Sequence, residues 1–340
     1  MANMNISTPR FYPDIVNFLM SRGLGQDGNF DVITGSNLIG VQTGSEAELF
    51  DMRPLNKVDF NTSAATSDHV LVNIDTQSTS TKKSFVAILN HNMASADAKV
   101  LIKASNTESH VQAVNMGSAT AMTSPEEVVN ANSIGSSIVT PDSDGSTIVK
   151  FTEQSLRYWG IQFEGNSSNT FSSTDLFVGC ILIGEYYDMP HAPDLNVTRM
   201  ISYNRLNDLQ ESHGGQRFSN LKSYGRTAES TSKSPFTTAS NGYDSQGGRL
   251  IYDMNFSFIN STDLMPDEYD IIADDDNFVD DVWNKTNGNH IPFIFSIDKS
   301  SEGDNAESEH IFGRFANNSL DMAQVAPNVF NVSLTVEEEF

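Results

Sequence analysis

The sequence predicts an all-β protein built of two β-sandwich domains. The run HVLVNIDT at 69–76 alternates apolar and polar residues, which is typical of a strand with one face in water. The runs SFVAILNHN at 84–92 and FVGCILIG at 177–184 are mostly apolar, as in strands buried on both faces. Many short strands between turn-forming residues, with almost no helical periodicity, favour a sandwich or jelly roll.

We expect three segments along the chain. Residues 1–192 form a jelly-roll-like sandwich with a leading helix, residues 193–246 form an irregular Gly/Ser-rich connecting arm, and residues 247–340 form a second sandwich with one helix. At 340 residues the chain is longer than one average domain, which agrees with two cores.

The opening segment PRFYPDIVNFLMSRG at 9–23 carries the clearest helical signal. Pro13 suits the first turn, Asp14 lies near the positive end of the helix dipole, and Gly23 ends the helix. Three apolar residues recur at i, i+3 and i+4 and form one stripe: Ile15, Phe18 and Leu19. We expect this stripe to pack on a sheet or on a neighbouring subunit, and its first two residues are candidate interface residues.

Between residues 30 and 190 the sequence predicts nine strands. Each is a short run of strand-forming residues bounded by clusters of Gly, Ser, Asn or Asp. The expected strands are 38–42, 58–60, 69–74, 84–90, 99–105, 111–114, 147–151, 157–164 and 176–186.

The C-terminal segment combines strands with one helix. RLIYDMNFSFI at 249–259 alternates with a period of two and predicts a strand. NFVDDVWNKTNG at 277–288 predicts a short helix that ends at its glycine. The remaining expected strands are IPFIFSID, HIFGRFAN and NVFNVSLTVEEEF, which begin at 291, 310 and 328.

The chain is strongly acidic. It has 44 Asp and Glu against 20 Lys and Arg, a formal net charge of −24. Such a field repels phosphate backbones, so we expect no sequence-specific nucleic-acid partner. No apolar stretch approaches the ~18 residues of a transmembrane helix, so membrane insertion is not expected. The polar N-terminus predicts no signal peptide.

The connecting arm is the most basic part of this acidic chain. A long irregular connection is functional, disordered or docked on a partner. A solvated linker and a segment that contacts the acidic surface of a neighbour are equally open interpretations. The candidate interface residues here are Arg199, Arg205, Arg217, Lys222 and Arg226.

The sequence gives no motif for catalysis or for a cofactor. It has no Gly-x-Ser-x-Gly elbow and no His-Glu-x-x-His pair, and no Gly-x-Gly-x-x-Gly fingerprint follows a strand. The single cysteine, Cys180, lies inside an apolar run, where a buried packing role is expected. We therefore expect a protein that is not an enzyme and that holds no cofactor.

One loop has the spacing of a calcium-binding loop. Its oxygen-bearing residues and glycine fall at positions 1, 3, 5, 6 and 12 of an EF-hand-type pattern. They are Asp298, Ser300, Glu302, Gly303 and Glu309. The flanking segments predict strands and not helices, so a plain acidic hairpin loop is favoured over a calcium site.

Two tyrosines at the end of a strand are candidates for glycan contact. Tyr186 and Tyr187 follow the apolar run at 177–184 and could offer an aromatic platform to a sugar. Trp159, with Ile161 as its alternating partner, is expected to point into the core instead.

Four segments in this order resemble structural proteins of tailed-bacteriophage virions. They are TPRFYPDIVNFLMSRG, FVAILNHNM, YWGIQFEG with VGCILIGEYYDMPHAPDL, and IPFIFSID with VAPNVFNVSLTVEEEF. The resemblance implies a tail or tail-tip component whose C-terminal unit has the fold shared by tube, hub and distal-tail proteins. Those proteins assemble as rings, usually hexameric. In typical distal-tail proteins the tube-like domain comes first, whereas here the order is expected to be reversed.

The resemblance therefore implies a non-enzymatic structural protein located in the virion. Its partners would be other virion proteins and further copies of the same chain. These copies would form a ring, which in such proteins is usually a hexamer. Two other functions stay open: a carbohydrate-binding module for adhesion to a host, and a capsid decoration or fibre-connector protein.

Overall fold

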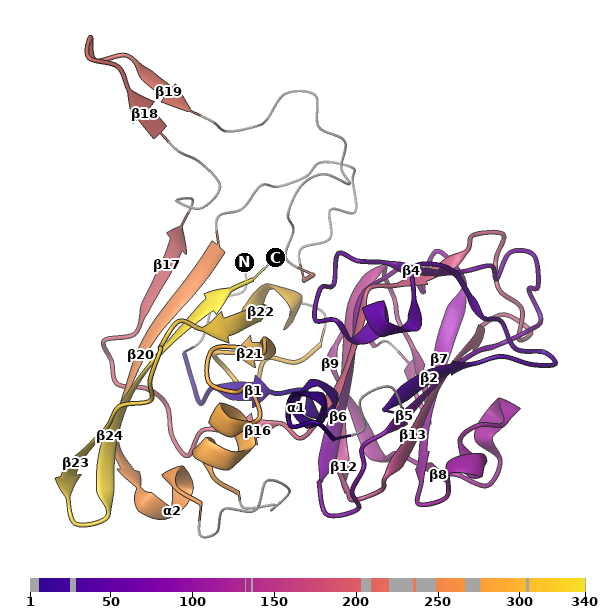
Figure 1. The fold of residues 1–340 in the computed structure, drawn as a ribbon, viewed down its shortest axis with the longest axis horizontal. Helices are drawn as coiled ribbons and strands as arrows, with labels where there is room; N and C mark the ends of the chain where they lie inside the picture. Colours follow the sequence, from indigo (N-terminus) through magenta and orange to yellow (C-terminus); the bar gives the residue numbers. More distant parts are fainter. Residues whose placement is uncertain are drawn as a thin grey trace.

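Figure 1 shows the fold in a computed structural model of the chain. The structure describes residues 6–24, 29–131, 133–135, 137–202, 209–219, 235–236, 249–266, 276–303 and 306–339. The described strands pair in antiparallel sheets and the helices are short, so the predicted all-β class is confirmed.

Two sheets form a sandwich in the N-terminal part of the chain. The larger sheet has the order β10 (Ser133–Ile134), β11 (Ile138–Thr140), β7 (Ala98–Ser105), β13 (Tyr158–Gly165), β5 (Val70–Asp75) and β2 (Phe30–Ile33), with β8 (Thr120–Ala121) paired to β7. The smaller sheet has the order β15 (Cys180–Gly184), β6 (Lys83–His91), β12 (Gly145–Gln154) and β9 (Thr123–Val129). A third sheet joins β14 (Leu176–Val178), β4 (Val58–Phe60) and β3 (Val41–Thr43).

The smaller sheet is buried on both faces, as its apolar runs predict. On β6, Val86 and Ile88 belong to the core between the two sheets, while Phe85 and Leu89 belong to a second core on the other face. Trp159 is fully buried in the first core, as expected, and packs on the ring of Phe151 with 5.4 Å between the centroids. The predicted strand 176–186 is divided at Gly179 into β14 and β15.

Strand β5 does not have the wet face that its alternation predicts. Leu71 and Asn73, on the face away from the main core, are both buried. Two short 3-10 turns, η3 (Glu108–His110) and η4 (Val114–Met116), cover that face. Met116 lies against Gly160, where a Cβ atom would come within 2.1 Å of its sulfur. The strand predicted at 111–114 is wrong because this segment forms the covering turns.

The second unit is one sheet of eight strands. Its order is β16 (Tyr187–Asp188), β1 (Arg10–Tyr12), β21 (Phe293–Ser296), β22 (His310–Phe315), β24 (Val329–Glu338), β20 (Arg249–Asn260) and β17 (Thr198–Ser202), with β23 (Met322–Ala326) paired to β24. In Figure 1 this sheet lies on the left, the sandwich lies on the right, and β1 crosses from one to the other. The other described elements are η2 (Glu46–Phe50), η7 (Ala306–Glu309), and the hairpin of β18 (Leu209–Glu211) with β19 (Arg217–Ser219).

The first and last parts of the chain share this sheet, which corrects the predicted division at residues 192 and 247. Strand β1 pairs with β21 from Arg10↔Ser296 to Tyr12↔Ile294, and with β16 on its other side. The sandwich is therefore inserted into the second unit after β1, and the chain returns to that unit at β16. Residues 10–12, at the start of the segment with the helical signal, are a strand because Pro13 follows them and the helix begins only after it.

Helix α1 (Ile15–Ser21) begins after Pro13, which was expected in its first turn, and has Asp14 at its N-terminus. Asp14 is the N-cap and its Oδ2 accepts a hydrogen bond of 2.7 Å from the backbone N–H of Asn17. Ile15 and Phe18 are buried in the core between the sandwich sheets. Their assignment as interface residues is corrected, since the chain's own core already covers both side chains.

A π-helix and a short α-helix cover one apolar face of the eight-stranded sheet. The π-helix η6 (Val279–Asn284) occupies the predicted helical segment, and α2 (Ser261–Leu264) follows β20. Phe11 of β1 meets Phe278 and Phe293 there, with 5.7 Å between ring centroids in both pairs. A separate core joins the sheet's other face to the smaller sandwich sheet, so the molecule has three β layers.

We expect Phe11→Ala to lower the free energy of unfolding by about 3–5 kcal/mol, because it leaves a cavity in the core of a sheet formed mainly by the far end of the chain. The matched control is Phe258→Ala, on β20, whose side chain is 72% exposed. It should change the stability by no more than about 0.5 kcal/mol. Urea denaturation measures both, and equal effects would contradict the position of β1.

Candidate functional site

The junction between the sandwich and the large sheet is built where the chain leaves and re-enters that sheet. Gly184, at the return, lies so close to the exit that a Cβ atom would come within 2.3 Å of the carbonyl oxygen of Pro13. Asp14 ties the two passages together, because its Oδ1 accepts a hydrogen bond of 3.1 Å from the N–H of Ile183. Burial raises the pKa of Asp14 to about 6. The hydrogen bonds that its carboxylate accepts act in the opposite direction and lower the pKa, but burial has the larger effect.

A chain of ion pairs crosses the same junction. Arg10 donates to both carboxylate oxygens of Asp188, at 2.6 and 3.0 Å, and its guanidinium lies 4.2 Å from the ring centre of Tyr186. Arg10 also lies 3.5 Å from Glu302, which is 2.5 Å from Lys150 of β12. Charged side chains thus join the large sheet to the smaller sandwich sheet.

An acidic cavity of about 270 Å³ lies beside this ion-pair chain. Its lining residues come from the return segment, α2 and the start of η6: Glu185, Tyr186, Tyr187, Asp188, Pro190, Asp263, Asp276 and Asp281. The hydroxyl of Tyr187 donates a hydrogen bond of 3.0 Å to the carbonyl of Asp263. Burial, together with the nearby carboxylates, raises the pKa of Tyr187 well above its usual range. The cavity therefore has a negative potential that disfavours anions.

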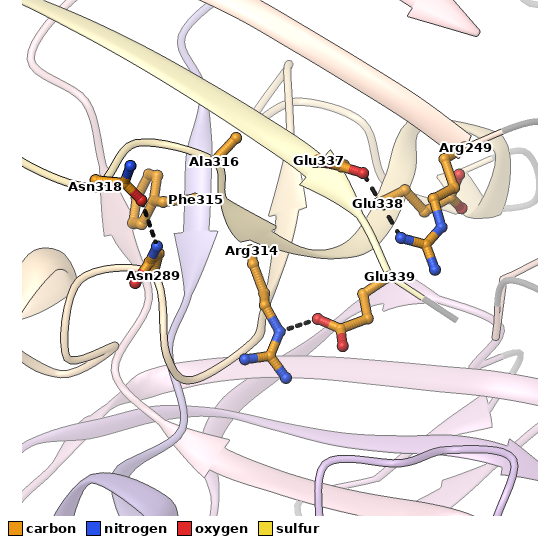
Figure 2. Close-up of a pocket in the computed structure, with 9 residues that line it drawn as sticks. All are labelled: Arg249, Asn289, Arg314, Phe315, Ala316, Asn318, Glu337, Glu338 and Glu339. Atoms are coloured by element: carbon orange, nitrogen blue, oxygen red, sulfur yellow. Dashed lines mark hydrogen bonds and ion pairs between the residues drawn. The ribbon is translucent and has the colours of Figure 1, made fainter. Parts of the chain in front are cut away.

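A larger cavity of about 390 Å³ lies at the ends of β20, β22 and β24 (Figure 2). Its charged side chains are arranged as opposite pairs. Arg314 donates to Glu339, and Arg249 Nη1 lies 3.6 Å from Glu337. Figure 2 also shows Asn289 donating to the side chain of Asn318, at 3.2 Å. The arrangement can receive a polar group of either sign, and its lining contains no serine, cysteine or histidine that could act as a nucleophile or base.

The buried histidines and the cysteine are placed for packing. Burial lowers the pKa of His91 to about 3 and that of His310 to about 4, so both rings are neutral near pH 7. His91 bonds Thr147 at 2.9 Å, and His310 Nδ1 lies 2.8 Å from the carbonyl oxygen of Ala306. Burial raises the pKa of the Cys180 thiol, which opposes thiolate chemistry.

The calcium-loop residues are engaged in a hairpin connection. Asp298 Oδ1 accepts a hydrogen bond of 2.9 Å from the N–H of Ser300, and Glu302 forms the ion pairs of the junction. Glu309 ends η7, after residues 304–305, which are outside the described part. Within the described residues, no group of three or more His, Cys, Asp or Glu side chains is arranged to hold a metal ion.

The predicted glycan contacts do not form an open aromatic platform. Tyr187 is buried, and Tyr186 is partly buried beneath the guanidinium of Arg10. This corrects the expectation that both rings lie on the surface. They instead line the acidic cavity, where Tyr187 is fixed by its hydrogen bond.

The predicted basic arm is only partly described. Arg199 is exposed on β17, with its guanidinium 5.8 Å from the ring centre of Tyr252. Arg217 lies on β19, while Arg205, Lys222 and Arg226 lie outside the described residues.

Sequence reasoning missed the residues that hold the junction together. Arg10 and Asp188 are 178 positions apart, and neither belongs to a recognisable motif. Tyr12 alternates with Phe11 along β1 and could have indicated a strand buried on both faces. That signal is only three residues long and adjoins a stronger helical pattern.

The comparisons with known proteins give little that bears on function. No family model and no curated protein matches the sequence. Chitosan-binding module 1 from a chitosanase/glucanase of Paenibacillus sp. IK-5 is a solved structure that matches at 15% identity, with 46% of this chain and 92% of that chain covered. The TM-score is 0.28, and a likeness at this level supports no statement about fold or ligand. In the described part of the chain, no helix is long and apolar enough to span a membrane.

The buried, neutral ring of His310 should make the folded protein less stable in acid. Its folded-state pKa lies below the unfolded value of 6.5, so the unfolded chain binds more protons, and stability falls as the pH falls from about 6.5 to 4. Between pH 7.5 and 5 we expect His310 to account for a loss of about 2 kcal/mol. In His310→Gln this part of the pH dependence should vanish, whereas the control His213→Gln, at an exposed position, should retain it. Urea unfolding at the two pH values tests this, and an unchanged slope in His310→Gln would refute it.

Proposed function

We propose that this protein is a non-enzymatic structural component of a tailed-phage virion, in the tail or tail tip, that acts by ring assembly and by docking neighbouring virion proteins. The observation that carries the proposal is the edge strand β17, which among the described residues has no second strand partner in the eight-stranded sheet. The resemblance of four sequence segments to phage structural proteins gives the biological setting.

Strand β17 ends the sheet and presents apolar side chains on both of its faces. Its one described strand partner is β20, where Met200 pairs with Ile251 and Ile201 pairs with Leu250. Met200 is 38% exposed and Ile201 is 61% exposed. Successive side chains of a strand point to opposite faces, so each face of the edge carries one exposed apolar side chain beside polar ones. Monomeric proteins usually protect such an edge with charges, proline or a covering loop.

The edge strand suits a contact that repeats from copy to copy. The opposite end of the same sheet is β16, a different surface, and the proposal is that β17 of one copy contacts a surface of the next copy other than its β17. A heterologous contact of this kind closes into a ring when its rotation permits. Arg199 on β17 also offers a cation to the surface of a chain with net charge −24.

The double variant Met200→Lys with Ile201→Lys should abolish self-association, because two charges replace the apolar side chains at the edge. The matched control is Val325→Lys on β23, whose valine is 47% exposed but lies at another edge. Light scattering coupled to gel filtration at micromolar concentration measures the assembly state. A wild-type protein that stays strictly monomeric, or a double variant that assembles as the wild type does, would refute the proposal.

A further inference from the structure

We propose that Asp281 and Lys285 become joined by an intramolecular isopeptide bond, which the folded chain forms by itself with Glu185 as the proton carrier. This inference concerns a covalent modification and does not depend on the proposed role in a virion.

The three side chains form a compact buried group. Lys285 Nζ lies 2.9 Å from Asp281 Oδ1 and 3.6 Å from Glu185 Oε2. Asp281 is only 2% exposed, and Lys285 and Glu185 are each 8% exposed. Glu185 comes from the return segment, far from the other two residues in the sequence. The amine, the carboxyl carbon and a second carboxylate therefore meet in a place largely shielded from water.

The helix that carries Asp281 and Lys285 has unusual geometry. The segment Val279–Asn284 is a π-helix, a rare form that often occurs at functional sites. Lys285 is its C-terminal capping residue and Asp281 lies in its first turn. A pair at i and i+4 already lies on one side of an α-helix, and the wider π turn keeps the two side chains on the same side. The short Asp281 side chain and the long Lys285 side chain can thus be bridged with little movement of the backbone.

The surroundings favour the uncharged forms that amide formation needs. Burial disfavours an isolated ion pair relative to a neutral amine and a neutral carboxylic acid. Five carboxyl groups line the adjacent cavity, and repulsion between neighbouring carboxylates favours protonation of one of them.

The bond-forming step follows from the positions of the atoms. Glu185 accepts a proton from Lys285 Nζ and passes it to Asp281 Oδ1, which leaves a neutral amine beside a neutral carboxylic acid. The amine attacks Cγ, and the negative charge that develops on Oδ2 is stabilised by the backbone N–H of Asn277, which donates to it at 3.2 Å. Glu185 then moves a second proton from Nζ to Oδ1, the Cγ–Oδ1 bond breaks, and water leaves through the adjacent cavity. One C–N bond forms, one C–O bond breaks, and one water is released, with no oxidant or reductant.

The same chain contains a matched pair that should stay ionic. Lys150 lies 2.5 Å from Glu302 and 3.0 Å from Glu126, so it also has an amine between two carboxylates. Glu126 is largely exposed, and water stabilises these charges. Burial is the physical difference between the two groups, and it predicts amide formation only at Lys285.

Peptide mass spectrometry of the purified full-length wild-type chain tests the inference. Trypsin should fail to cleave after Lys285, and the resulting peptide should weigh less than its sequence by one water, with no fragment ions from bonds between 281 and 285. Peptides containing Lys150 should have unmodified masses. A wild-type chain that is cleaved after Lys285 and has its full sequence mass would overturn the proposal.

Two variants separate the chemistry from the ion pair. Lys285→Arg keeps the positive charge but cannot form this amide, and Glu185→Gln keeps the shape but cannot carry the proton. Each should give linear peptides of full mass while retaining the β-sheet circular dichroism of the wild type. Dehydration that persists unchanged in Lys285→Arg would refute a Lys285 bond, because it would place the lost water elsewhere in the peptide.

Discussion

The pairing of β1 between β16 and β21 is the interaction on which the rest of the structure depends. Its two sides bring residues from the beginning, the middle and the end of the chain into one sheet. Its two faces contribute to different cores: Phe11 packs beneath η6, while Tyr12 packs against the smaller sandwich sheet. A strand of three residues therefore holds three β layers together. Burial of its side chains on both faces contributes more to this than its few backbone hydrogen bonds to neighbouring strands.

This pairing also explains why the charged junction lies where it does. Because the sandwich is inserted after β1, the chain must leave the sheet at Pro13 and return at Gly184, and the two passages touch. Arg10 and Asp188 stand at the ends of those passages, and their bidentate pair closes the insertion. Such a buried pair fixes geometry more than it adds stability, since desolvation offsets much of the attraction. The hydrophobic core behind it supplies the free energy.

The hydrophobic pattern of the sequence predicted the strands in which each face has a uniform environment, either buried or polar. β6 and β15 are apolar throughout because they are buried on both faces, and β20 alternates because one of its faces is polar. The sequence could not show that η4 covers the sheet at β13 and β5, because the contact of Met116 with Gly160 of β13 joins residues 44 positions apart. The junction and the group around Lys285 were missed for the same reason. Their members are ordinary charged residues that only the folded topology brings together.

The edge strand β17 lies in the eight-stranded sheet, and the buried lysine group lies on the helix that covers this sheet, so the two are connected mechanically. A force applied to β17 passes through β20 and β24 to β22, β21 and β1. The aromatic core of that sheet is covered by η6, through contacts of Phe278 with Phe11 and Phe315. If the covering helix unwound, water would reach this core and the strands would lose their packing. The proposed amide between Asp281 of η6 and its capping residue Lys285 would oppose that unwinding without linking any two strands, so the sheet could still adjust its twist.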